Sequence, residues 1–135
     1  MMAAKAVCCA VLAGAAALAT GSSAQAVQAW TPFFMIKQGV IYIDRNSVEH
    51  DGDKVSMTTE LWYETPADLR GQKLNYVRSR LNVNCVDRTF VVTDQRFYGM
   101  DGQMVGENTS PSPPKTAPGG TFESALMTAY CPQRR

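Results

Sequence analysis

The sequence has only one histidine, His50, among its 135 residues, and this scarcity limits the chemistry that the chain can perform. Ser-His and Cys-His catalytic pairs and multi-histidine metal sites would all have to use this one residue. His50 lies between Glu49 and Asp51 in a charged segment typical of a solvated turn, and the sequence places no nucleophile beside it. We therefore predict that the protein is not an enzyme and binds no metal ion.

Phosphate-binding loops and an excess of charge are missing as well. The glycines form neither a G-x-G-x-x-G nor a G-x-x-x-x-G-K-[ST] pattern, so we predict no nucleotide and no other cofactor. The segment Asp51-Gly52-Asp53 lacks the later ligands of a calcium-binding loop. Because 13 basic residues face 12 acidic ones, there is no electrostatic case for a nucleic-acid partner or for an anionic membrane surface.

The sequence has no apolar run long enough to cross a bilayer. Its longest run, residues 6–19, is shorter than the roughly 20 residues that a spanning helix needs. Lys5 precedes this run, and Ala24-Gln25-Ala26 follows it as an A-x-A cleavage site, which is typical of a secretory signal peptide. A transmembrane anchor is the alternative reading. We predict that residues 1–26 are cleaved and that residues 27–135 form one periplasmic or secreted domain.

Cysteine is also scarce, and its four copies fall into two pairs. Cys8 and Cys9 lie in the predicted leader, too early to carry a lipid anchor at the cleavage site. Cys85 and Cys131 remain in the exported domain, where an oxidising compartment favours a disulfide between them. A metal site or a reactive thiol is the alternative, but two distant cysteines and one histidine make a poor ligand set.

What the sequence does contain is a series of short segments with alternating apolar and polar residues. This alternation is typical of half-buried strands. We predict strands at residues 40–43, 55–63, 75–85 and 88–98, a loop at residues 65–73, a hairpin centred on Asp101-Gly102, an extended proline-rich connection at residues 108–120 and a helix at residues 122–130. The fold class predicted is α+β: a small antiparallel β-sheet meander with a C-terminal α-helix packed on it and one disulfide.

A pairing register follows from the two faces of the longest segments. Placing Leu61 opposite Val77 brings Met57 to Leu81 and Val55 to Val83 on the inner face. The same register brings Glu60 to Arg78 on the outer face. Continued across the next turn, it places Phe90 beside Val83 and Val92 beside Leu81.

The outer face in this register carries the strongest candidate for a binding surface. It aligns three aromatic residues with two arginines, and both residue types are enriched at protein contacts. The candidate binding residues are Trp62, Tyr76, Arg78, Arg80 and Phe97. The alternative is structural: residues 30–36 cover Trp62, Tyr76 and Phe97, or these three side chains only stabilise the sheet as cross-strand pairs.

Several segments, in order and spacing, resemble the surface-adhesin protein E family of Gram-negative bacteria. They are the run from Gly39 to Asp44 with Ser47, the strand ending in Asn84-Cys85, the hairpin from Tyr98 to Val105, and Pro118-Gly119 leading to Tyr130-Cys131. The resemblance implies a small antiparallel sheet with a C-terminal helix and a disulfide. It also implies adhesion to host extracellular-matrix proteins.

We therefore expect an exported, non-enzymatic protein-binding module of the bacterial envelope. Its partner is an unidentified protein, with a host extracellular-matrix protein as the candidate that the resemblance implies. The absence of a cysteine at the cleavage site favours the periplasm over the outer surface. The alternative function is a periplasmic small-ligand-binding protein or an enzyme inhibitor of the lysozyme-inhibitor type.

Overall fold

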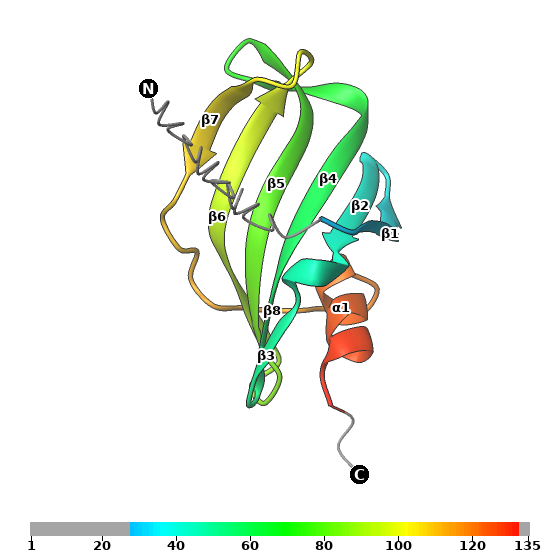
Figure 1. Cartoon of the computed structure of the whole chain (residues 1–135), viewed down its shortest axis with the longest axis vertical. Helices are drawn as coiled ribbons and strands as arrows, with labels where there is room; N and C mark the ends of the chain where they lie inside the picture. The colour runs from blue at the N-terminus through cyan, green and yellow to red at the C-terminus, as the bar shows by residue number, and fades with distance from the viewer. Residues whose placement is uncertain (1–27, 133–135) are drawn as a thin grey trace, which may run out of the picture.

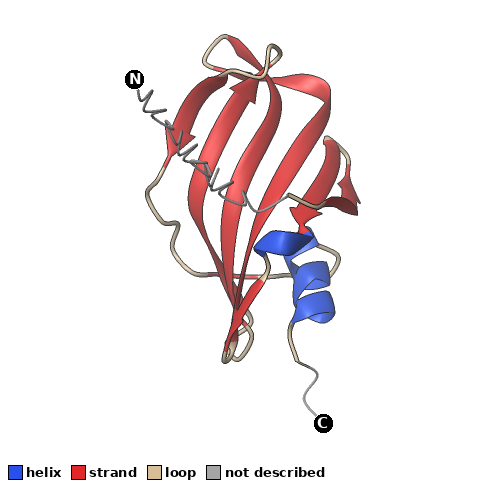
Figure 2. Cartoon of the chain, in the orientation of Figure 1, coloured by secondary structure: helices blue, strands red, loops and turns tan. Residues whose placement is uncertain are grey.

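The computed structural model describes residues 28–132, so the predicted leader lies outside the described residues. An antiparallel sheet dominates the fold, and one short helix lies beside its lower end in Figures 1 and 2. The strands are β1 (Trp30–Ile36), β2 (Gly39–Asp44), β3 (Glu49–Asp51), β4 (Lys54–Leu69), β5 (Gln72–Asn84), β6 (Thr89–Gly99), β7 (Met104–Asn108) and β8 (Lys115–Thr116). The helices are a 3-10 turn, η1 (Arg45–Ser47), and α1 (Phe122–Tyr130).

Six strands lie side by side in the order β1-β2-β4-β5-β6-β7, and every pair is antiparallel. The short strand β3 adds to β4, and β8 adds to β6. The expected antiparallel sheet, C-terminal helix and disulfide are thus confirmed. The predicted register between β4 and β5 is also confirmed, because Leu61 faces Val77 and Glu60 faces Arg78.

The core lies between α1 and one face of the sheet, which we call the inner face. It is made of aliphatic, aromatic and sulfur-containing side chains that are nearly or fully buried. They are Ile41, Ile43, Val55, Met57, Leu81, Val83, Phe90, Phe122, Leu126, Met127 and Cys131. A bulge in β1 turns Phe33 and Phe34 toward the helix, where the ring of Phe33 meets that of Phe122 edge-on at 5.9 Å.

Both ends of α1 are fixed. At its start, the Thr121 hydroxyl accepts a hydrogen bond from the Ser124 amide and so satisfies one of the unpaired N–H groups of the first turn. At its end, Cys131 forms a disulfide with Cys85, which follows β5. The disulfide therefore ties the last turn of the helix to the end of a central strand.

The prediction of a loop at residues 65–73 is wrong, because β4 and β5 continue through most of this segment. Arg70 and Gly71 both have positive φ, 49° and 82°, and form a two-residue hairpin turn between β4 and β5. The pairing register shifts between Trp62 and Ala67, so Pro66 lies in a stretch without a ladder partner and need not donate a backbone hydrogen bond. Similarly, Glu49–Asp51, expected as a turn, pairs with β4 as β3.

The proline-rich connection is tied to the sheet at two points. Ser112 exchanges two hydrogen bonds with Val92: its amide donates to the Val92 carbonyl, and its hydroxyl accepts from the Val92 amide, both at 2.9 Å. Three residues later, Lys115 pairs with Phe90 in the short β8–β6 contact. The connection therefore follows β6 toward the helix, as Figure 1 shows for the segment between β7 and α1.

Candidate functional site

The face opposite α1, which we call the outer face, carries an apolar band that crosses the whole sheet. One residue from each of six strands contributes to it, and each is paired directly with the next. In spatial order the apolar band is Met35, Val40, Trp62, Tyr76, Tyr98 and Met104. At about 4.8 Å per strand, it spans roughly 24 Å.

The three central members form an aromatic row of stacked rings. Trp62 stacks on Tyr76 with ring centroids 4.3 Å apart, and Tyr76 stacks on Tyr98 at 4.5 Å. The ring planes deviate from parallel by only 16° and 10°. Because the centroid spacing matches the distance between strands, the rings stand upright on the sheet and present their edges outward. Each ring packs against its neighbour, and this contact restricts the side-chain rotamers available to both.

Large apolar side chains of the apolar band remain accessible to solvent. Met35 is 79% exposed at one side, Met104 is 51% exposed at the other, and Trp62 is 38% exposed between them. Exposed apolar residues scattered singly are ordinary, but a contiguous patch marks a contact surface. The members of the apolar band are neighbours, because each is paired with the next across adjacent strands.

A charged row runs alongside the apolar band on the same face, two residues along each of the three central strands and three along β7. It consists of Glu60, Arg78, Arg96 and Glu107, each opposite the next. The Arg78 guanidinium donates to the Glu60 carboxylate at 3.2 Å, with side-chain exposures of 29% and 4%. Burial of a carboxylate is costly without such a partner, so this ion pair is a structural requirement of the outer face.

Arg78 also joins the charged row to aromatic rings. Its guanidinium carbon lies 5.4 Å from the ring centroid of Trp30 and 5.6 Å from that of Tyr98, within the range of cation–π attraction. From the segment of residues 30–36, the Trp30 ring thus lies against Arg78, which the alternative of a covered aromatic set did not include. That alternative does not hold for Trp62, whose side chain stays accessible.

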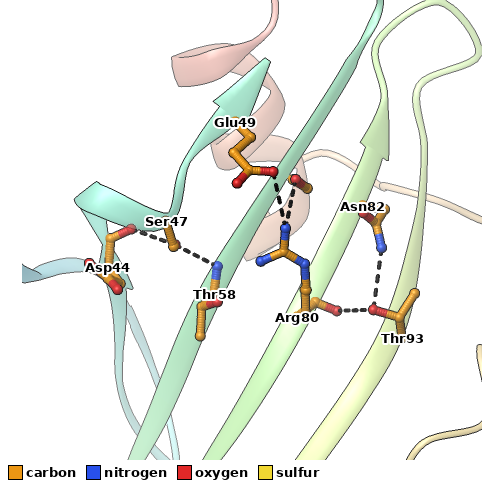
Figure 3. Close-up of polar contacts among 8 residues, drawn as sticks. Asp44, Ser47, Glu49, Thr58, Arg80, Asn82 and Thr93 are labelled. Atoms are coloured by element: carbon orange, nitrogen blue, oxygen red, sulfur yellow. Dashed lines mark hydrogen bonds and ion pairs between the residues drawn. The ribbon is translucent and has the colours of Figure 1, made fainter. Parts of the chain in front are cut away.

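Arg80 lies further toward the lower end of the sheet. Its guanidinium donates to the Ser56 hydroxyl at 3.1 Å and forms an ion pair with the exposed Glu49 carboxylate at 3.5 Å (Figure 3). The backbone carbonyl of Arg80 accepts a hydrogen bond from the Thr93 hydroxyl, as Figure 3 also shows. A long, exposed ion pair contributes little to stability, so the Arg80 side chain is available to a partner.

A polar cluster around the buried Asp44 lies at the N-terminal edge of the site. Asp44 accepts hydrogen bonds from the Ala29 and Asn46 amides, and its backbone carbonyl accepts one from the Ser47 hydroxyl. Ser47 in turn accepts from the Thr58 amide at 2.8 Å, which joins η1 to β4 (Figure 3). This arrangement fixes the chain just before Trp30 and so positions the Trp30 ring over Arg78.

Electrostatics at the aromatic row favour a neutral phenol at Tyr76. Burial of the Tyr76 hydroxyl raises its pKa above the ordinary 10.0, and the Glu60 carboxylate raises it further. Arg78 acts in the opposite direction, and Tyr98 adds to the increase. At physiological pH the row therefore offers hydroxyl donors beside apolar ring edges, a combination suited to protein contacts.

The structure brings Trp62, Tyr76, Arg78 and Arg80 together on the outer face, but the prediction for Phe97 is wrong. Phe97 pairs with Val77 on the inner face, and Tyr98 takes the predicted place beside Tyr76. The cause is a bulge in β6: Arg80 faces Asp94 while Leu81 faces Val92, so Thr93 is the extra residue. Phe97 instead lines a hollow of about 380 Å³ near Leu69 and Val105.

Trp30, Tyr98, Arg96 and the two exposed methionines were missed by sequence reasoning. The signal for Tyr98 and Arg96 was present, because an unbroken register in β6 would point Asp94 and Arg96 into the core. Only a bulge removes both charges from the core. Met35 gave no comparable signal, since its position depends on the bulge in β1.

No group of histidine, cysteine and acidic side chains within residues 28–132 could hold a metal ion. Over the same residues, no helix combines the length and apolarity that crossing a membrane requires.

One comparison with known proteins shows the family, and another shows solved structures with a similar fold. The family model described as surface-adhesin protein E matches residues 30–132. No curated protein matches the chain. A structure of Haemophilus influenzae protein E superimposes with a TM-score of 0.54 at 15% identity, covering 77% of this chain and 91% of that one. A structure of protein E from non-typeable Haemophilus influenzae gives a TM-score of 0.52 at 14% identity and covers 74% of each chain.

Proposed function

The chain belongs to the surface-adhesin protein E family, and we propose that it is an exported, non-enzymatic module that binds another protein with the outer face of its sheet. The observation that carries this proposal is the apolar band, which crosses all six strands and leaves Met35, Trp62 and Met104 accessible. Aromatic, methionine and arginine side chains are the residue types enriched at protein contacts.

Export is supported by the leader-like residues 1–26 and by the disulfide between Cys85 and Cys131. Disulfides persist in the periplasm and outside the cell, whereas cytosolic thiols are kept reduced. We therefore propose that residues 27–135 form the exported domain and that it acts in an oxidising compartment. A host extracellular-matrix protein is the first partner to test, because the family is one of surface adhesins.

Binding to a panel of immobilised, purified extracellular-matrix proteins tests the proposal, with surface plasmon resonance as the readout. We expect one of them to bind the purified domain, and we expect Trp62→Ala to weaken that binding by about 30-fold, the effect of a central hot-spot residue. Met100→Ala is the matched control: Met100 is 57% exposed but lies in the β6–β7 turn, outside the apolar band. Equal binding by both variants would exclude the outer face as the contact surface.

Where the protein acts is a separate question that needs intact cells. Protease treatment of whole cells degrades the protein only if it reaches the surface. If the matrix panel binds the purified domain but the protein on cells resists protease, adhesion is excluded as its native role, and a periplasmic partner takes the place of the matrix protein.

A further inference from the structure

A small hollow opens on the outer face next to the charged row. Its volume is about 220 Å³. Its lining includes Thr58, Arg78, Arg80, Asp94 and Arg96 from three central strands, and Gln28, which lies two residues before β1. Pockets for whole small molecules usually measure about 300 Å³ or more, so a hollow of this size suits a single functional group.

The charge of the lining favours an anion. Three guanidinium groups face one carboxylate, that of Asp94, which lies opposite Arg80 across the strands. Within residues 28–132, Arg96 forms no ion pair, and the one ion pair of Arg80 is the long one with Glu49, beside its hydrogen bond to the Ser56 hydroxyl. Arg78 is paired with Glu60, but its buried Nε has no hydrogen-bond partner. The guanidinium groups around the hollow are therefore only partly neutralised by carboxylates of the described residues.

We propose that this hollow binds one carboxylate of the partner protein, the side chain of an aspartate or glutamate. Guanidinium groups bind carboxylates through paired N–H donors, which gives both affinity and orientation. The partner's neighbouring apolar side chains then lie on the aromatic row, since Arg78 contacts Tyr98 and borders the hollow. This inference rests on the proposed function and adds the chemistry of the residue that the partner presents.

An isolated carboxylate fits the surroundings better than a polyanion does. Asp94 lies in the lining, while Glu49, Glu60 and Glu107 lie next to the arginines along the strands or in ion pairs with them. The whole chain is nearly neutral, with 13 basic and 12 acidic residues. A sulfated glycan or a nucleic acid requires an extended basic surface, and these acidic neighbours would repel its successive charges.

The test uses small probes and nuclear magnetic resonance of the purified domain. One probe is the peptide acetyl-Gly-Glu-Gly-amide, and its neutral control is acetyl-Gly-Gln-Gly-amide. We expect the glutamate peptide to shift the side-chain Nε–Hε signals of Arg80 and Arg96 in a saturable manner, and the glutamine peptide to leave them unchanged. Arg96→Gln, at an exposed position, is expected to weaken the response about tenfold, whereas Asp94→Asn strengthens it.

Lys37→Gln removes one positive charge from the exposed β1–β2 turn and should leave the response as in the wild type. A response that is equal in Arg96→Gln and in the wild type, or that does not saturate, overturns the proposal. A heparin oligosaccharide that binds at physiological salt and shifts the same arginines, when the glutamate peptide does not, overturns the assignment of a carboxylate. Because no matrix protein is present, the outcome is independent of the plasmon-resonance experiment, and either proposal can fail alone.

Discussion

The Tyr76 ring stacks on the Trp62 ring across the β4–β5 pair, with centroids 4.3 Å apart and planes 16° from parallel. The two residues are directly opposite in the ladder, and Tyr98 continues the stack on the other side of Tyr76. Holding three aromatic rings in one conformation on a central part of the sheet reduces the entropy lost when a partner binds. The aromatic row is therefore a sheet-stabilising contact, and in the function proposed above it is the preformed centre of the binding surface.

The surroundings of Tyr76 predict that the free energy of unfolding decreases at alkaline pH. Because burial and Glu60 raise the pKa of Tyr76, the folded state favours the neutral phenol. Its stabilising contribution is complete below about pH 10 and is lost as the pH rises through the folded-state pKa. Tyr63, whose pKa is also raised by burial, contributes with the same sign. Urea unfolding at several pH values above 9 should show a smaller alkaline decline in Tyr76→Phe than in the wild type; an identical decline would contradict this electrostatic account.

The Arg78–Glu60 ion pair on the outer face should contribute far more to the free energy of unfolding than the Lys73–Asp68 ion pair on the β4–β5 hairpin. Arg78→Met leaves the Glu60 carboxylate, which is 4% exposed, without its cation, and we expect a loss of about 2 kcal/mol in the free energy of unfolding. Lys73→Met, the control, breaks the ion pair with Asp68, in which both side chains are more than half exposed, and should cost less than about 1 kcal/mol. Chemical denaturation measures both.

A second change separates the charge effect from lost packing. In the double variant Glu60→Gln/Arg78→Met, the buried charge is gone together with its partner, so we expect higher stability than in Arg78→Met alone. A double variant that is no more stable would show that the arginine acts through its contacts with Trp30 and Tyr98.

One glycine is required by the close approach of two strands. A Cβ at Gly39 would overlap the carbonyl oxygen of Trp62, which belongs to the backbone and cannot move aside cheaply. Gly39→Ala should therefore separate β2 from β4 and cost at least about 2 kcal/mol. Gly119→Ala, where a Cβ meets nothing within 4 Å, should change stability by less than about 0.5 kcal/mol. Thermal unfolding of the two variants side by side provides the comparison.

The disulfide is expected to supply a large part of the stability. Cys85 and Cys131 are separated by 46 residues, and closing a loop of that size stabilises the folded state by about 4 kcal/mol in the chain-entropy model. For a small domain with a total of about 5–15 kcal/mol, the variant Cys85→Ser/Cys131→Ser should unfold at much lower urea concentration. If the variant lost less than about 1 kcal/mol, the packing of α1 on the inner face would be sufficient to hold it.

Sequence periodicity predicts the paired strands well wherever both faces constrain the register. In β4 and β5, one choice places Leu61 opposite Val77 and Glu60 opposite Arg78, and a slip by one residue would bury the charges. The same reasoning predicts α1, because Thr121 precedes an apolar stripe with helical spacing. These are local and pairwise constraints that a single sequence contains.

What the sequence does not show directly is where a strand departs from regular alternation. The bulge at Thr93 exchanges Phe97 for Tyr98 on the outer face, and the bulge in β1 turns both Phe33 and Phe34 toward α1. Bulges change the face of every later residue in the strand, so one error moves a whole set of side chains. The aromatic row was therefore predicted correctly in two of its members, Trp62 and Tyr76, and wrongly in the third.

The claim that a partner binds the outer face is tested most directly by the methionine methyl groups. Met35 and Met104 lie at the two sides of the apolar band, Met100 is exposed in the β6–β7 turn, and Met57 and Met127 are buried in the core. With ¹³C-methyl-methionine domain and the matrix protein that binds it, we predict that the Met35 and Met104 signals shift or broaden while those of Met100 and Met57 do not. Changes confined to Met100 or Met127, with Met35 and Met104 unaffected, would contradict the account.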